Sequence, residues 1–265
     1  MKRILLLLVA VALSLVTASA QDWAKARLDK SPRHHEWVKV KQGNREINCF
    51  VAYPEVKDKA TAVLIIHEIF GLSDWMRSTA DQLAEAGYIA IAPDLLSGLG
   101  KNGEGTAGLD GNDAITKAVT SLPADQVTAD LNAVADYVTK LPSCNGKLAV
   151  GGFCWGGGQA FRYATSNKDI KAAFVFYGPP PAEEAMSKIN CPVYGFYGGN
   201  DNRIGATIPK ASEQMKKAGK TYEPVTYEGA GHGFMRAGEA PDASDANKKA
   251  HDEGWKRWKE LLKKI

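Results

Sequence analysis

A cysteine stands between two glycines where an apolar run of the sequence ends. The run 148–152 leads to Cys154, which Gly152 and Gly156 bracket as the glycines bracket serine in the G-x-S-x-G nucleophile elbow. In such an elbow the chain turns sharply from a strand into a helix, and the start of that helix favours a thiolate. The spacing predicts that Cys154 is a nucleophile. A cysteine buried beside a glycine-rich turn is the alternative, because free cysteines are commonly buried.

An aspartate and a histidine follow this cysteine on two later loops. Asp201 comes after the strand-like run 193–197, and His232 comes after the run 224–227. In α/β-hydrolases the acid and the base follow the nucleophile in this order, and such sheets bind ligands at the carboxyl ends of their strands. The order favours a triad in which His232 takes the proton of Cys154 and Asp201 orients His232. Taken singly, Asp201 also fits a turn cap and His232 an ordinary loop residue.

Acyl transfer also requires hydrogen-bond donors for the negative charge that develops on the carbonyl oxygen. The backbone N–H of Trp155, directly after the candidate nucleophile, is one such donor. The second is expected in the segment 67–72, after the apolar run 62–66, and Ile69 is the candidate. Glu68 beside it is unusual at the end of an apolar strand, because a desolvated carboxylate needs a partner. Glu68 therefore either caps a local turn or interacts with the nucleophile.

Apolar runs bounded by turn residues alternate with segments of helical periodicity along the chain. This alternation predicts a mostly parallel sheet with helices on both faces. The turn-prone residues 42–44 predict a hairpin of residues 36–40 and 48–53, and hence an antiparallel N-terminal edge. Strands are expected at 62–66, 88–92, 148–152, 172–177, 193–197 and 224–227, and helices at 74–86, 124–141, 156–164, 207–217 and 244–262.

The segment 97–120 interrupts this alternation. It is rich in glycine and shows little periodicity, at a place where the connection between a strand and a helix should be short. We expect a loop or lid over the site. The fold class predicted from these elements is α/β, with the order of an α/β-hydrolase.

The first twenty residues have the layout of a secretory signal peptide. Lys2 and Arg3 precede the apolar run 4–16, and a small-x-small cleavage pattern ends at Ala20. The run is shorter than the roughly 20 residues that a membrane-spanning helix needs, and no later segment approaches that length. An uncleaved anchor is the alternative. We expect cleavage after Ala20, one domain over residues 21–265, a periplasmic or secreted location and no stable membrane association.

The sequence predicts neither a metal nor an organic cofactor. The cysteines show no C-x-x-C pair, the histidines show no H-x-x-x-H spacing, and the glycines around Cys154 form no dinucleotide or Walker fingerprint. The formal charge of +3 falls to +1 without Lys2 and Arg3, which gives no electrostatic reason to expect nucleic-acid binding. The basic residues between 248 and 264 alternate with apolar ones, which predicts the solvated face of a packed terminal helix.

The pairing of the cysteines is left open by the sequence. An exported protein meets an oxidising compartment, where free thiols tend to pair. Cys144 and Cys191 each precede a strand-like apolar run, so a disulfide between them is conceivable. Spacing alone does not fix disulfide connectivity.

The sequence resembles the dienelactone hydrolase family, whose members are also called carboxymethylenebutenolidases. The resemblance rests on five short segments that follow one another in the family's order and span most of the chain. It implies the α/β-hydrolase fold, a Cys-His-Asp triad, and hydrolysis of a lactone or ester without a cofactor. The matching segments are 67–72, 92–95, 152–157, 197–201 and 231–234.

The resemblance also implies roles for residues around the triad. It places Ile69 and Trp155 in the oxyanion hole, and it implies that Glu68 contacts the resting thiol until substrate displaces it. It further implies that Arg236, four residues after His232, binds a carboxylate of the substrate, which suits the fork geometry of arginine. A surface arginine is the alternative.

A second substrate-binding arginine of the family is missing here. Ser97 and Gly98 occupy the region where it is expected. Lys101 is a candidate replacement, although a mobile surface lysine explains that residue better. The departure leaves the exact substrate open.

Together these features favour an exported hydrolase that opens a small, anionic lactone or ester through an acyl-enzyme at Cys154. A broader carboxylesterase or thioesterase is the alternative among hydrolases. A non-catalytic binding protein is the alternative from another class, because a fold does not fix a function. A thiol redox role lacks a nearby resolving cysteine in the sequence. The oligomeric state and the natural substrate stay open.

Overall fold

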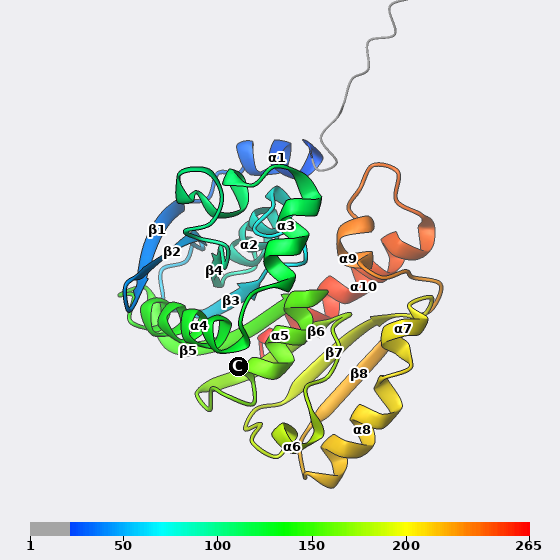
Figure 1. The fold of residues 1–265 in the computed structure, drawn as a ribbon. Helices are drawn as coiled ribbons and strands as arrows, with labels where there is room; N and C mark the ends of the chain where they lie inside the picture. The colour runs from blue at the N-terminus through cyan, green and yellow to red at the C-terminus, as the bar shows by residue number, and fades with distance from the viewer. Residues whose placement is uncertain (1–21) are drawn as a thin grey trace, which may run out of the picture.

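One eight-stranded sheet runs through the computed structural model, which describes residues 22–265 (Figure 1). The predicted signal peptide lies outside these residues. The strand order is β1-β2-β4-β3-β5-β6-β7-β8, in which β2 pairs antiparallel with β1 and β4 and the remaining neighbours are parallel. This confirms the predicted mostly parallel sheet with an antiparallel N-terminal edge. The strands are β1 (His35–Gln42), β2 (Arg45–Ala52), β3 (Ala60–Ile66), β4 (Ile89–Pro93), β5 (Cys144–Phe153), β6 (Ile170–Phe176), β7 (Val193–Gly198) and β8 (Tyr222–Tyr227).

Helices cover both faces of the sheet because its central strands bury side chains on both sides. In β3, Leu64 packs into one core cluster with α4, α5 and α8, whereas Val63 and Ile65 pack into a second cluster with α2 and α10. Successive residues of a strand point to opposite faces. The helices are α1 (Asp22–Asp29), α2 (Asp74–Glu85), α3 (Gly111–Thr120), α4 (Ala124–Thr139), α5 (Trp155–Tyr163), α6 (Glu183–Met186), α7 (Asn202–Gly205), α8 (Ile208–Lys217), α9 (Phe234–Ala237) and α10 (Asp245–Leu262).

The C-terminal helix α10 has the predicted amphipathic character. Trp258 is fully buried, and its indole packs against the rings of Phe153, Phe174 and Phe176 on the sheet. The lysines of the helix are exposed. The lysines are therefore the solvated side of a packed helix, whereas Arg257 lies over the ring of Phe196 and donates a hydrogen bond to the carbonyl of Gly195.

The prediction of a loop over residues 97–120 is wrong in part. The segment contains two 3-10 turns, η1 (Lys101–Gly103) and η2 (Gly105–Gly108), and the ten-residue helix α3. The sequence signal was weak because the first half of the segment is held by contacts with a distant side chain rather than by helical periodicity.

That side chain is Asp94, which directly follows β4 and is almost completely buried. Its carboxylate accepts hydrogen bonds from the backbone N–H of Thr106 (2.8 Å), the Thr106 hydroxyl (2.9 Å) and the N–H of Leu96 (3.0 Å). Gly105 passes so close that a Cβ there would lie 2.4 Å from Asp94 Oδ2. The segment is thus fastened to the end of β4.

All four cysteines are free thiols in the structure. Cys144 begins β5 and Cys191 lies just before β7, and β6 runs between these two strands. Strands two positions apart are separated by about 9–10 Å, beyond the roughly 7 Å that the Cα atoms of a disulfide tolerate. The disulfide that the sequence left open does not form here.

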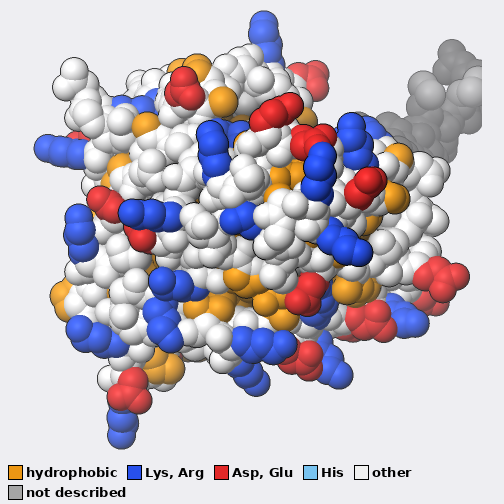
Figure 2. Space-filling view, turned by 90° about the horizontal axis from the view of Figure 1, so that it is seen from below, with side chains coloured by type: hydrophobic (Ala, Val, Ile, Leu, Met, Phe, Trp, Pro, Cys, Tyr) orange, Lys and Arg blue, Asp and Glu red, His pale blue; other side chains and the backbone are white. Residues whose placement is uncertain are grey.

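The surface mixes charges of both signs. On the face shown in Figure 2, lysine and arginine side chains are interspersed with acidic and neutral ones. Within residues 22–265, no helix combines the length and the apolar character that crossing a membrane requires.

Candidate active site

The turn from β5 into α5 has the geometry of a nucleophile elbow. Cys154 adopts φ 55° and ψ −115°, a strained conformation for a residue with a side chain. The surrounding backbones pack too closely for any Cβ: one on Gly152 would lie 2.0 Å from the carbonyl oxygen of Gly156, and one on Gly156 would lie 2.3 Å from that of His67. The glycines that bracket Cys154 are therefore a steric requirement of this turn.

The three residues of the expected triad lie in one hydrogen-bonded line. His232, on the loop after β8, places Nδ1 2.5 Å from Oδ2 of Asp201 and Nε2 3.2 Å from Sγ of Cys154. Asp201 follows β7, is buried, and also accepts a hydrogen bond from the N–H of Ile204 through Oδ1 (3.3 Å). With the Nδ1 proton donated to Asp201, Nε2 is the nitrogen that can accept the thiol proton.

The backbones of Trp155 and Ile69 both reach the candidate nucleophile. Burial raises the pKa of the Cys154 thiol, and the negative charge of Glu68 raises it further, while hydrogen bonds from the backbones of Trp155 and Ile69 lower it. The net direction is upward, so the thiol form is favoured at rest. The two predicted oxyanion donors thus converge on the sulfur from the start of α5 and from the loop after β3.

Glu68 lies buried against Arg236. It is 2% exposed, and its Oε1 forms an ion pair with Nε of Arg236 at 2.9 Å, although that N–H does not point straight at the oxygen. Burial raises the pKa of the Glu68 carboxyl, and the charge of Arg236 opposes that rise. The hydrogen-bond partner of the resting thiol is His232 and the ion-pair partner of Glu68 is Arg236, so the contact of Glu68 with the thiol stays a prediction.

Arg236 itself lies on α9 at the edge of a cavity of about 620 Å³. Its guanidinium also lies over the ring of Phe70, 5.4 Å from the centroid. Where a second arginine was expected, Ser97 is buried and its hydroxyl donates to the carbonyl of Asp94. Lys101 is exposed and does not line this cavity, so it does not replace that arginine.

Tyr177 belongs to this site, and sequence reasoning missed it. It directly follows β6, adopts φ 41°, is fully buried, and places its ring 5.1 Å from that of His232. Burial raises the pKa of its hydroxyl well above the usual value, and the charge of Glu68 contributes in the same direction. A tyrosine followed by Gly178 at the carboxyl end of a predicted strand is the signal that was available.

His67 is a further missed residue beneath the elbow. It is fully buried, its Nδ1 lies 2.8 Å from the carbonyl oxygen of Glu68, and its ring stacks on that of Trp155 at 5.6 Å. Burial lowers the pKa of this imidazole. These contacts tie the two segments that carry the candidate oxyanion donors to each other.

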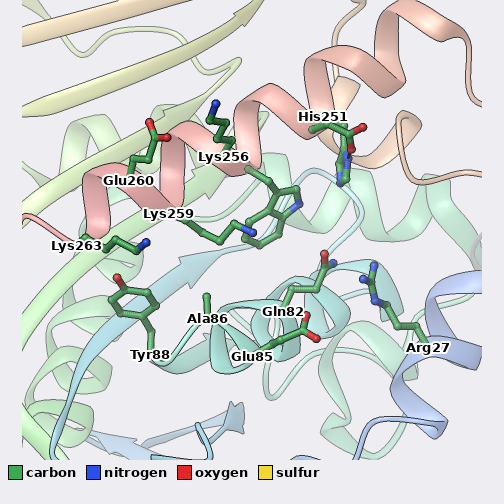
Figure 3. A pocket seen from close by; sticks show the side chains of 12 residues that line it. Arg27, Gln82, Glu85, Ala86, Tyr88, His251, Lys256, Lys259, Glu260 and Lys263 are labelled. Carbon is green, nitrogen blue, oxygen red and sulfur yellow. Dashed lines mark hydrogen bonds and ion pairs between the residues drawn. The ribbon is translucent and has the colours of Figure 1, made fainter.

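A second groove, of about 630 Å³, lies between α2 and α10 and contains none of the triad residues. Figure 3 shows Lys259 and Lys263 on α10 across from Gln82 and Glu85 on α2. Over residues 22–265, no group of three or more histidine, cysteine or acidic side chains is arranged to hold a metal ion. The hydrogen-bonded line from Asp201 through His232 to Cys154 is what equips this site for nucleophilic chemistry.

Comparison with known proteins assigns this constellation to a family. The sequence pattern of the dienelactone hydrolase family matches residues 47–265, which include all seven site residues predicted from the sequence. The chain belongs to the dienelactone hydrolase family. It is accordingly a hydrolase of carboxylic esters with the α/β-hydrolase fold.

Relatives within the dienelactone hydrolase family are distant but cover most of the chain. A provisionally named carboxymethylenebutenolidase of Salmonella typhimurium is 31% identical over 224 residues, which span 80% of each protein. One from Methylorubrum extorquens is 29% identical over 232 residues, 83% of this chain and 77% of the relative. A provisionally assigned dienelactone hydrolase from Klebsiella pneumoniae superposes with a TM-score of 0.77 at 27% identity, covering 88% of this chain and 99% of its own.

Proposed function

We propose that this protein is an exported dienelactone-hydrolase-like enzyme that opens small, anionic lactones or esters through an acyl-enzyme on Cys154. The observation that carries the proposal is the continuous line from Asp201 through His232 to Cys154, with separations of 2.5 and 3.2 Å. Cys154 stands at the head of this line on a strained turn. These are the parts that nucleophilic acyl transfer requires.

In the first half of the reaction the thiol of Cys154 adds to the carbonyl carbon. The S–C bond forms as the proton leaves the sulfur for Nε2 of His232, and Asp201 stabilises the resulting imidazolium. The backbone N–H groups of Ile69 and Trp155 donate hydrogen bonds to the negatively charged carbonyl oxygen. Collapse of this intermediate breaks the C–O bond, and the alcohol or enolate oxygen leaves with the proton that His232 donates from Nε2.

In the second half a water molecule attacks the thioester and releases the acid. His232 takes a proton from this water, the thiolate of Cys154 leaves, and His232 returns the proton to the sulfur. The resting thiol form is favoured because burial and the charge of Glu68 raise the pKa of Cys154. Each turnover consumes one water, and no cofactor is needed.

The anionic preference is argued from Arg236. In the structure this guanidinium is paired with Glu68, which is buried and close enough to Cys154 for its charge to act on the thiol. A substrate carboxylate that binds Arg236 competes with Glu68 for the same cation. Binding of an acidic substrate thus changes the charge environment of the nucleophile at the moment when the substrate arrives.

Export is proposed from the sequence of residues 1–20, which combines a basic start, an apolar run and a small-residue cleavage pattern. The test is the mass of the mature protein recovered from the periplasm or medium of cells that express the full chain. An N-terminus at Gln21 supports export, whereas an intact Met1 in the cytoplasmic fraction contradicts it.

The test of the chemistry is ring opening of a dienelactone, followed by absorbance, with residues 21–265 and the Cys154→Ala variant. Turnover by the wild type alone supports the cysteine mechanism and the substrate class. Equal turnover by both proteins overturns the mechanism. Hydrolysis of neutral 4-nitrophenyl esters without any action on dienelactone leaves a cysteine esterase and overturns the substrate.

A further inference from the structure

The cavity beside Arg236 is lined by none of the triad residues, but two of its lining residues are close in sequence to the candidate site. Phe70, which lines it, is adjacent to the oxyanion donor Ile69, and Arg236 lies four residues after His232. Nη2 of Arg236 lies close to the loop that carries His232, because a Cβ on Gly233 would lie 3.8 Å from this nitrogen. A substrate whose ester bond lies at Cys154 can therefore extend into this space.

The cavity is larger than a single lactone ring requires. Its volume of about 620 Å³ falls in the range of pockets that hold extended ligands. Its walls come from α2, η2, α3 and α9. Between its charged residues the lining is mixed: Phe70, Leu72, Ala107 and Ile115 are apolar, and Ser73, Thr106 and Asn112 are polar.

Two arginines line this cavity, and each is seated on aromatic rings. Arg236 lies over Phe70, as described above, and Arg77 on α2 lies 5.7 Å from the ring centroid of Trp37 and 5.8 Å from that of Phe50. The side chain of Arg77 is 27% exposed, so its guanidinium is restrained but accessible. A guanidinium held in this way is preorganised to form a bidentate hydrogen-bonded ion pair with a carboxylate.

The present partner of Arg77 is easily replaced. Asp74, one turn earlier on α2, forms an ion pair with Nη2 of Arg77, and both side chains are 27% exposed. Partly solvated pairs of this kind contribute little to stability. A carboxylate presented by a bound substrate, whose other end is already held at the reaction centre, competes with Asp74 at a high effective concentration.

From this geometry we propose that Arg77 is a specificity-determining residue that binds an acidic group at the far end of an elongated ester substrate. The inference rests on the proposed function at Cys154. The chemical class is an ester or lactone with an apolar middle and a terminal carboxylate, longer than a compact dienelactone. Asp74 acts against this binding, because it occupies the same guanidinium.

The experiment compares 4-nitrophenyl monoesters of straight-chain dicarboxylic acids of increasing length with the esters of monocarboxylic acids of equal length. We expect KM of the wild type to pass through a minimum at one length of the acidic series and to show no such minimum in the neutral series. Arg77→Gln should raise KM at that length by about tenfold, with kcat nearly unchanged. Asp74→Asn should lower KM for the acidic ester of that length.

Two controls separate the outcomes. Arg27→Gln alters an exposed arginine of α1 outside this cavity and should change neither series. Titration of Cys154 with iodoacetamide and the unfolding temperature report on the integrity of each variant. Equal KM changes for acidic and neutral esters, or a wild type indifferent to length, overturn the role of Arg77 alone. A folded wild type that opens dienelactone but hydrolyses neither ester series overturns this inference alone, whereas one that acts on neither series nor on dienelactone overturns the proposed function as well.

Discussion

The ring of Tyr177 lies edge-on to the imidazole of His232, with the ring centroids 5.1 Å apart and the planes at 61°. The same ring also contacts Phe234, two residues beyond His232. Tyr177 therefore supports the loop that carries the candidate base, from the neighbouring end of β6. Its positive φ shows that the backbone is strained in order to hold this position.

Two substitutions of Tyr177 distinguish the contribution of its ring to catalysis from that of its hydroxyl. Tyr177→Phe should keep kcat within about threefold, because the ring that restrains His232 remains. Tyr177→Leu should lower kcat by about tenfold or more, since small errors in the placement of a catalytic group are costly. Both variants carry the same backbone strain, so the comparison of kcat on one ester isolates the ring. Equal values for the two variants would show that the ring contact is irrelevant.

The charge of Glu68 should be visible in the reactivity of Cys154. Because that charge raises the pKa of the thiol, Glu68→Gln should lower the pKa and increase the thiolate fraction at pH 7. We expect iodoacetamide to alkylate Cys154 about three- to tenfold faster at pH 7 in the variant, with a rate profile moved to lower pH. Glu85→Gln, on the exposed end of α2, serves as the control. An unchanged or slower rate in Glu68→Gln would contradict the electrostatic coupling.

His251 should make stability depend on pH. Burial lowers the pKa of its imidazole, but the hydrogen bonds to Glu239 and Asp252 and the charges of these two residues together raise it more, so the net direction is upward. A raised pKa means that the folded state binds the proton more tightly than the unfolded state. The resulting stabilisation is therefore complete at pH values below the pKa of His251 in the unfolded chain, and it is lost as the pH rises through the pKa in the folded protein. Between pH 6 and pH 8 the unfolding temperature of the wild type should therefore fall relative to that of His251→Gln. Parallel curves for the two proteins would refute the assignment.

The close packing at the elbow makes Gly156 intolerant of a side chain. A Cβ would lie 2.3 Å from the carbonyl oxygen of His67 and 2.4 Å from that of Ile66, and neither backbone can move without disturbing β3. Gly156→Ala should destabilise the fold by about 3 kcal/mol, measured by urea unfolding. Gly205→Ala is the matched control, because nothing lies within 4 Å of its Cβ position, and we expect it to be neutral or slightly stabilising. A similar loss for both variants would argue against a steric cause.

The parts of the structure that the sequence predicted are those governed by local pattern. The strand that leads to Cys154 and the helix that follows it are encoded by an apolar run and glycines, so their order and the order of Asp201 and His232 could be read directly. The short helix α1 was missed because only Ala24 is buried within it, which leaves almost no apolar periodicity to detect.

The partner of Glu68 could not be predicted because it depends on distant residues. Arg236 lies far along the chain, and only the folded arrangement of α9 against the loop after β3 brings its guanidinium to the carboxylate. The conformation of Tyr177 has a similar origin. It is followed by Gly178, where a Cβ would lie 2.2 Å from the backbone nitrogen of Gly158, and no local sequence pattern reports that approach.

The hydrogen bonds that hold residues 94–106 in place affect which substitutions this enzyme can accept during evolution. The carboxylate of Asp94 ties Thr106 to the end of β4, and Arg45 and Asn48 hydrogen-bond to Leu95 and Ser97, whereas α3, farther along the chain, supplies Asn112 and Ile115 to the cavity wall. Substitutions on α3 can therefore reshape the cavity while the reaction centre keeps its geometry. Substitutions that change which substrates bind therefore fall on other residues than those that carry out the reaction. During evolution this enzyme can change its substrate preference and keep its catalytic residues in place.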